Sequence, residues 1–156
     1  MASIRNSPSD LYERDYYAWL LDQVRALRER RIEDLDWENV AEEIEGLSRS
    51  ERHSIRSQMA RVAEHLLKLQ YARGIFLSYN ARGWRVSVRS ARRQMRELLN
   101  ESPSLWPQLA EMLVRAYEDG RIEALREPSL SEDILPEASP WTLEQIMDDA
   151  FLPQHE

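Results

Sequence analysis

The residues that interrupt helices are scarce in this chain, and their positions favour long helices. No proline occurs between Pro8 and Pro103, and the 156 residues include only four glycines. Proline is the strongest helix breaker, and the close turns of a β-sheet depend on glycine, proline and asparagine. No polar–apolar alternation persists between turn signals, so strands are not expected either. The sequence therefore predicts an all-α fold.

Apolar residues recur at three- and four-residue spacing in five long segments, which predicts about five main helices and a short sixth. Asp36 is a natural N-cap for the second helix. Gly46 and Ser48 predict a break after it, and Ser48 with Glu51 forms a capping-box spacing that opens the third. The expected helices cover about 10–31, 36–47, 48 to a connection at 74–83, 83–100, 105–125 and 141–150.

A chain of this length matches one ordinary domain, so we expect a single-domain helical bundle with antiparallel neighbours. The bundle is predicted over 10–153 with an irregular loop at about 128–140, between a disordered or extended N-terminus at 1–9 and a tail at 154–156. The absence of cysteine excludes disulfides and thiolate chemistry. Without a membrane-length apolar run or an apolar signal region, we expect a cytoplasmic protein with no membrane contact.

Charge is distributed unevenly along the chain. Residues 1–48 carry 6 Arg and 12 Asp or Glu, a net charge of −6. Residues 49–98 carry 11 Arg, one Lys and 3 Glu, a net charge of +9. Residues 99–156 carry 3 Arg and 13 Asp or Glu, a net charge of −10. The overall charge of −7 disfavours general nucleic-acid binding, but the basic middle could face an acidic surface.

The predicted helix over 83–100 has the most distinctive pattern. At about 100° per residue, its apolar seam includes Trp84, Val88 and Met95, while its arginines fall about 80–180° from Trp84. Like charges at i,i+4 cost about 0.2–0.5 kcal/mol per pair, so something negative is expected to face them. This arginine ridge consists of Arg82, Arg85, Arg89, Arg92, Arg93 and Arg96.

Three counterparts of the arginine ridge stay open. The first is an acidic segment such as 33–45, from the same chain or a second copy, together with plain solvation. The second is a protein partner with an acidic face. The third is RNA or another phosphate ligand, which the two-pronged guanidinium suits. Replacing Arg85, Arg89 and Arg93 together should abolish phosphate binding if it occurs.

The remaining candidate residues fit structural roles at least as well as chemical ones. His65 lies at the boundary of an apolar stripe, where it could be a structural histidine or take part in ligand binding or acid–base chemistry. No Glu-x-x-His spacing, nucleophile motif or phosphate loop occurs, so we predict no metal, cofactor or catalytic residue. Core anchoring is the default role of the five tryptophans, and an exposed one would mark an interface.

Several segments together resemble the bacterial family called domain of unknown function 29. They cover nearly the whole chain in the expected order. The resemblance implies an all-helical domain with no established activity, and it supplies no catalytic residues. The matching segments are LYERDYYAWLLDQV at 11–24, LDWENVAEEIEGLSRSER at 35–52, HLLKLQY at 65–71, GWRVSVRSARRQMRELLNESPSL at 83–105 and LPEASPWTLEQIMDDAFLP at 135–153.

Our first functional hypothesis is a non-enzymatic interaction module that binds a protein partner or itself through its acidic and basic helical faces. The alternative is RNA or phosphate-ligand binding by the arginine ridge, a role that overall charge disfavours for nucleic acid. A third hypothesis is an unrecognised enzyme that uses His65 with a carboxylate. The candidate binding residues are the arginine ridge, His65 and Trp84.

Overall fold

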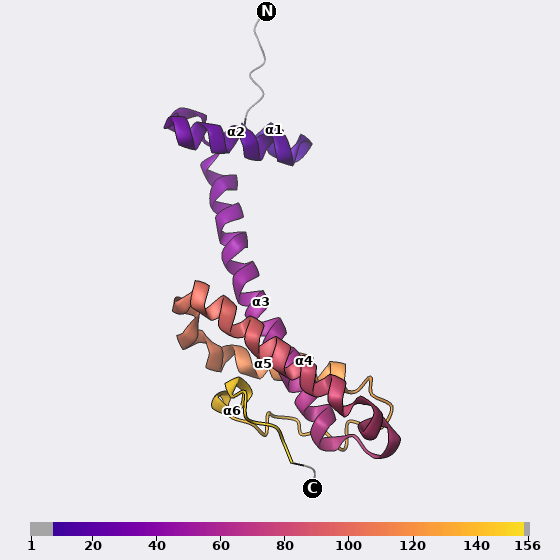
Figure 1. Cartoon of the computed structure of the whole chain (residues 1–156). Helices are drawn as coiled ribbons and strands as arrows, with labels where there is room; N and C mark the ends of the chain where they lie inside the picture. The colour runs from indigo at the N-terminus through magenta and orange to yellow at the C-terminus, as the bar shows by residue number, and fades with distance from the viewer. Residues whose placement is uncertain (1–7, 155–156) are drawn as a thin grey trace, which may run out of the picture. The chain divides into compact units, whose positions relative to one another are not determined.

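The computed structural model describes residues 8–154 and confirms the all-α prediction, since no strand occurs within this range (Figure 1). Six α-helices and two 3-10 helices follow one another along the chain. They are α1 (Pro8–Arg14), α2 (Tyr16–Glu29), η1 (Ile32–Asp34), α3 (Trp37–Tyr71), α4 (Gly74–Glu101), η2 (Pro103–Gln108), α5 (Leu109–Ala124) and α6 (Leu143–Met147).

The helices divide between two compact units, Met1–Ser50 and Glu51–Glu156, and α3 contributes to both. That residues 10–153 form a single domain remains a prediction. Helix α1 starts two residues before the predicted start at Asp10, while the other predicted N-terminal residues, 1–7, lie outside the described range. No helix in residues 8–154 is both long and apolar enough to cross a membrane. Cytoplasmic location also stays a prediction.

In the N-terminal unit, the predicted helix over 10–31 is two helices. Asp15 separates them, because its carboxylate accepts a hydrogen bond from the Ala18 backbone N–H at 3.0 Å and so caps α2. Helix α2 ends at Arg30, whose φ of 57° takes the backbone into the left-handed region. Asp36 caps α3 as predicted, because its side chain accepts from the Asn39 backbone N–H at 3.4 Å.

The predicted break at Gly46 and Ser48 is wrong, because α3 is one continuous helix through both residues. A glycine in a helix interior costs only about 1 kcal/mol relative to alanine, which is too little to stop a helix by itself. Arg49 also spans this stretch, with its guanidinium 3.0 Å from the Glu42 carboxylate and 3.7 Å from that of Glu45. The capping-box residues Ser48 and Glu51 are therefore interior helix positions.

The predicted connection over 74–83 is also wrong, since α4 begins at Gly74 and continues through Gly83. Only Ala72 and Arg73 separate α3 from α4. Gly74 has a φ of +62°, a value that favours glycine, so the chain turns there at little steric cost. The added turns of α4 extend its exposed surface beyond the predicted arginine ridge.

The hydrophobic core of the C-terminal unit combines the second half of α3 with α4, α5 and α6. Its α3 residues include Ile55, Met59, Val62, Leu66 and Leu69, which follow one another at three- and four-residue spacing. Helix α5 approaches α3 closely at Gly120, where an added Cβ would lie 2.5 Å from the Ala60 carbonyl oxygen. Glycine is therefore required for this backbone contact.

Residues 128–140 contain no helix or strand, and α5 holds this segment in place. The Tyr117 hydroxyl donates a hydrogen bond to the Pro136 carbonyl at 2.7 Å, and the Arg121 guanidinium donates to the Glu132 carbonyl at 3.1 Å. Thr142 and Gln145 then form a reciprocal capping box that starts α6. This last helix is shorter than the predicted 141–150.

Candidate functional site

The apolar seam of α4 is confirmed, because Trp84, Val88 and Met95 are buried in the core of the C-terminal unit. Trp84 is thus a core residue and does not belong to the exposed candidate surface. The arginine ridge is not a uniform surface. Arg82, Arg85, Arg89 and Arg93 are exposed, Arg96 is half-buried and Arg92 is buried.

Arg92 differs most from the expected arrangement, since its side chain is fully buried. Its guanidinium donates three hydrogen bonds to backbone carbonyls, at 2.7 Å to Ile146, 2.8 Å to Phe151 and 3.0 Å to Gln145. Burial lowers the pKa of Arg92, although the negative charges of Asp149 and Asp148 oppose this. Arg92 therefore anchors the C-terminal segment to α4.

The helical wheel places Arg92 about 80° from Trp84, at the edge of the ridge nearest the apolar seam. This helical-wheel position was the only feature of the sequence that indicated a buried Arg92. The sequence could not reveal that the carbonyls at the end of α6 need donors there. Helix C-termini leave up to four carbonyls without helical partners, and Arg92 satisfies part of this requirement.

A groove of about 530 Å³ lies between α4 and the segment after α6. It is lined by Val86, Arg89, Ser90, Arg93, Arg96 and Asp149. Within it, the Arg96 guanidinium contacts the Asp149 carboxylate at 2.6 Å, and Arg93 lies 3.8 Å from the Glu97 carboxylate. Arg89 forms no ion pair within the described part of the C-terminal unit. The structure therefore gathers three of the predicted ridge arginines in one groove.

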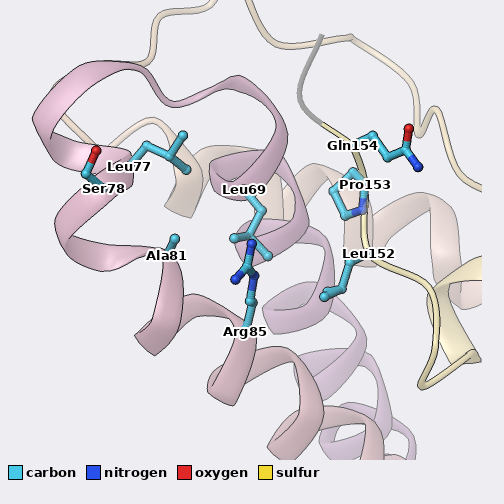
Figure 2. Close-up of a pocket in the computed structure, with 8 residues that line it drawn as sticks. All are labelled: Leu69, Leu77, Ser78, Ala81, Arg85, Leu152, Pro153 and Gln154. Atoms are coloured by element: carbon cyan, nitrogen blue, oxygen red, sulfur yellow. The ribbon is translucent and has the colours of Figure 1, made fainter.

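Arg85 lines a different recess, of about 490 Å³, between α4 and the last described residues. Figure 2 shows Arg85 and Leu69 among the residues that line this recess, together with Leu152 and Pro153 from the last described segment. The other walls are formed by Leu77, Ser78, Ala81 and Gln154. Because the lining is mainly apolar and contains one charge, this recess lacks the convergent polar groups of a specific ligand site.

His65 is half-buried on α3, and burial lowers its pKa. The carboxylate of Glu64 raises that pKa in opposition, while Lys68 and Arg61 lower it further. Its Nδ1 atom is buried without a hydrogen-bond partner among the residues described. Glu64 accepts a hydrogen bond from the Lys68 ammonium at 2.6 Å, so its carboxylate is already engaged. His65 lines neither recess, and the enzyme hypothesis stays a prediction without added support.

The N-terminal unit buries few side chains. Only Trp19, Gln23, Ala26 and Asp36 are buried between residues 10 and 50. This small core is partly polar, because the Trp19 indole N–H donates to the Asp36 carboxylate at 3.3 Å. The Gln23 side-chain oxygen accepts from the Asp36 backbone N–H at 2.8 Å.

A tyrosine pair fastens α1 and α2 to α3 within the same unit. The hydroxyls of Tyr12 and Tyr16 each donate a hydrogen bond of 2.7 Å to the Glu43 carboxylate. These bonds lower the pKa of Glu43, and the bond to Glu43 is the main cause that raises the pKa of Tyr12 to about 12. No group of three or more potential metal-ligating side chains is found within residues 8–154.

Most apolar side chains of the N-terminal unit stay exposed, although their spacing predicted helix-packing faces. On α3, the exposed fractions are 59% for Trp37, 62% for Ile44 and 68% for Leu47. We call these three residues the α3 stripe. On α2, Tyr17 and Leu27 are 71% and 49% exposed. The apolar period correctly predicted that these segments are helical but did not indicate whether a partner helix covers their apolar residues.

The comparisons with known proteins identify a family without an assigned activity. No curated protein and no solved structure matches the chain. The family model described as "Domain of unknown function DUF29" matches residues 11–152. Because this match covers most of the chain, in agreement with the resemblance noted from the sequence, the protein belongs to the DUF29 family.

Proposed function

We propose that this protein is a non-enzymatic interaction module whose N-terminal unit binds a protein surface, namely the exposed face of α4 on a second copy. The α3 stripe carries this proposal, because all three side chains are more than half exposed on an ordered helix. Trp37 is the strongest indication of an interface within this stripe, since a solvent-exposed tryptophan beside other apolar residues is typical of one.

The N-terminal unit has a physical reason to associate. A domain of about 60 residues is already marginal, because it buries only about 60% of its unfolded surface, and the N-terminal unit, Met1–Ser50, is smaller. Here the four buried residues include Gln23 and Asp36, so the apolar part of the core is even smaller. Covering the exposed part of each side chain in the α3 stripe would contribute about 1–2 kcal/mol to the free energy of association.

Helix α4 offers an exposed face of matching length. Ile75, Tyr79, Arg82 and Val86 follow one another at spacings of four, three and four residues, and all are exposed. We call these residues the α4 stripe. At about 1.5 Å per residue it is about 16 Å long, and the α3 stripe is about 15 Å long. Helices with such spacing pack by interdigitating their side-chain ridges.

Net charge also favours this pairing. The α4 stripe contains Arg82 and is bordered by Arg85, whereas the N-terminal segment that would meet it is acidic overall. Two N-terminal units paired with each other would instead bring together segments that each carry −6 over residues 1–48. Pairing between the α3 stripe and the α4 stripe is therefore favoured over pairing between two α3 stripes.

The expected assembly is a reciprocal dimer with two equivalent interfaces. Association costs roughly 4–15 kcal/mol in lost rotational and translational freedom, which offsets much of the apolar gain. We therefore expect micromolar dissociation and weaker association at high salt, since exposed ion pairs are screened. Light scattering and sedimentation equilibrium at low and high salt measure the dissociation constant and its dependence on salt. A monomer under both conditions would overturn the proposal.

Mixing two variants tests which surfaces meet. Ile44→Asp damages the α3 stripe and Val86→Asp the α4 stripe, so each variant alone should be monomeric. Their mixture should form a heterodimer, because one of its two interfaces then consists of unmodified stripes. Ile122→Asp is the control, since Ile122 is 61% exposed on α5 and outside both stripes. A Val86→Asp dimer as stable as the wild type would refute the α4 part of the proposal.

A further inference from the structure

We propose that the groove between α4 and the segment after α6 binds a phosphate group. Its polar lining consists of Arg89, Ser90, Arg93, Arg96 and Asp149, and Val86 forms an apolar wall. We call it the phosphate groove. This site goes beyond the interaction proposed above, because it binds an anion and needs no second copy. Val86 belongs to both surfaces, whereas the arginines of the groove follow the α4 stripe along the helix.

The three arginines converge because of their spacing. Arg89, Arg93 and Arg96 are at positions i, i+4 and i+7 of one helix, so their side chains leave the same face. Without a ligand, this arrangement concentrates like charge on an exposed surface. Guanidinium groups present two parallel N–H donors, which match the geometry of phosphate oxygens. A bound phosphate would therefore relieve the repulsion and receive several charged hydrogen bonds.

Hydrogen bonds and an ion pair within the chain hold the side of the groove that Asp149 forms. Asp149 contacts Arg96 at 2.6 Å and fixes the direction of its guanidinium. Asp149 is itself held in place by its neighbours, since the carbonyls of Gln145, Ile146 and Phe151 all accept hydrogen bonds from buried Arg92. A site whose side chains are already oriented loses less conformational entropy when it binds.

The charge of the groove matches one phosphate. Three guanidinium groups and the Asp149 carboxylate give a net +2 along the lining. A phosphate monoester carries about −1.5 to −2 near pH 7, whereas a carboxylate carries only −1. The nearby Glu97 is a weak competitor, because it lies 3.8 Å from Arg93 and both side chains are well exposed. A phosphate therefore neutralises the groove better than the carboxylate of an acidic peptide.

Ser90 adds a neutral donor. Its Oγ accepts a hydrogen bond from the Gln94 side-chain amide at 3.3 Å, which leaves the hydroxyl hydrogen available to the groove. The volume of about 530 Å³ accommodates the phosphate together with part of the molecule that carries it, and Val86, 55% exposed, can contact that part. The charge match applies to a phosphate monoester of a small phosphorylated molecule. A nucleic-acid backbone is the second possible source, but its diesters carry only −1 each and would rely on the paired guanidinium donors.

Titration of the isotope-labelled full chain with inorganic phosphate, followed by NMR, tests the proposal. We expect saturable shifts of the Arg89 and Arg93 Nε–H signals and of the Ser90 amide. Arg89→Gln and Arg93→Gln should each weaken phosphate binding about tenfold, the effect of losing one charged hydrogen-bonding partner. Arg115→Gln is the matched control, because Arg115 is exposed on α5 away from the groove and should leave the affinity unchanged.

A second titration with a short single-stranded RNA distinguishes the two sources of phosphate. If the phosphate of a small molecule is the ligand, inorganic phosphate binds saturably and the RNA binds no tighter. If a nucleic-acid backbone is the ligand, the RNA binds tighter, its affinity falls steeply with salt, and Arg82→Gln also weakens it. Either outcome supports the groove when Arg89→Gln reduces binding. No saturable shift with either probe, or equal loss in Arg115→Gln, would overturn the proposal.

Discussion

Replacing Arg92 with methionine tests whether a buried arginine holds the end of this fold together. The change keeps an unbranched apolar stem but removes the guanidinium that donates to the carbonyls of Gln145, Ile146 and Phe151, at 2.7–3.0 Å. A charged hydrogen bond contributes about 1.5–3 kcal/mol, so simple addition over three bonds would give at least 4.5 kcal/mol.

The net loss should be smaller than this sum. Methionine no longer requires a charge to be desolvated, and water can reach some of the carbonyls once the segment loosens. We therefore expect Arg92→Met to lower the free energy of unfolding by about 3 kcal/mol, a large part of the 5–15 kcal/mol typical of a domain. With a urea dependence near 2 kcal/mol per molar, the denaturation midpoint should fall by roughly 1.5 M.

Urea denaturation followed by circular dichroism at 222 nm measures this shift. Arg93→Met is the matched control, because Arg93 is the next residue on the same helix, its side chain is 69% exposed and its one ion pair is 3.8 Å long. The control should stay within about 0.5 kcal/mol of the wild type. If both variants have the same midpoint, the three hydrogen bonds of Arg92 do not stabilise the fold and the reasoning is refuted.

Three further predictions follow from local geometry. Gly120→Ala should destabilise the protein by about 1–3 kcal/mol in urea denaturation, because its Cβ would lie 2.5 Å from the Ala60 carbonyl oxygen; an unchanged midpoint would contradict this contact. Thr142→Ala should cost about 1 kcal/mol through the lost capping box and increase amide exchange in α6, whereas exchange in α2 stays constant. Burial lowers the pKa of His65 in the folded state, so the unfolded state binds its proton more readily. Stability is then full above about pH 6.5 and falls as the pH drops below it, and His65→Gln should reduce this fall between pH 7 and 5.

The sequence predicted those features of the fold that depend on local chemistry. Asp36 was identified as a helix cap because a cap needs only a side-chain acceptor within three residues. The seam of α4 was predicted from its period, and Trp84 and Met95 are buried as expected. The helix break predicted at Gly46 was wrong because the helix propensity of a single residue contributes little energy. The neighbouring helical turns outweigh it.

The candidate surfaces could be predicted only in part. The helical wheel identified the arginines but could not separate Arg92 from Arg93, because that difference depends on carbonyls more than 50 residues away in the chain. It could not place Asp149 beside Arg96 for the same reason. Tertiary contacts of this kind produce no periodic sequence pattern. The sequence therefore could not predict the phosphate groove, which depends on how the C-terminal segment packs on α4.

Helix α3 shows most directly why an apolar period does not identify its own partner. Apolar residues at three- and four-residue spacing occur in both halves of α3, from Trp37 to Leu47 and from Ile55 to Leu69. Ile55 and Met59 are fully buried, whereas Ile44 and Leu47 are more than 60% exposed. If the apolar residues of α3 served only to stabilise this chain, those in the exposed half would add no stability. Alanine or glutamate at the same positions favours the helix at least as well. Apolar residues in that half gain energy only when something covers them. The exposed half of α3, rather than the arginines alone, is therefore the strongest reason to regard this protein as an interaction module.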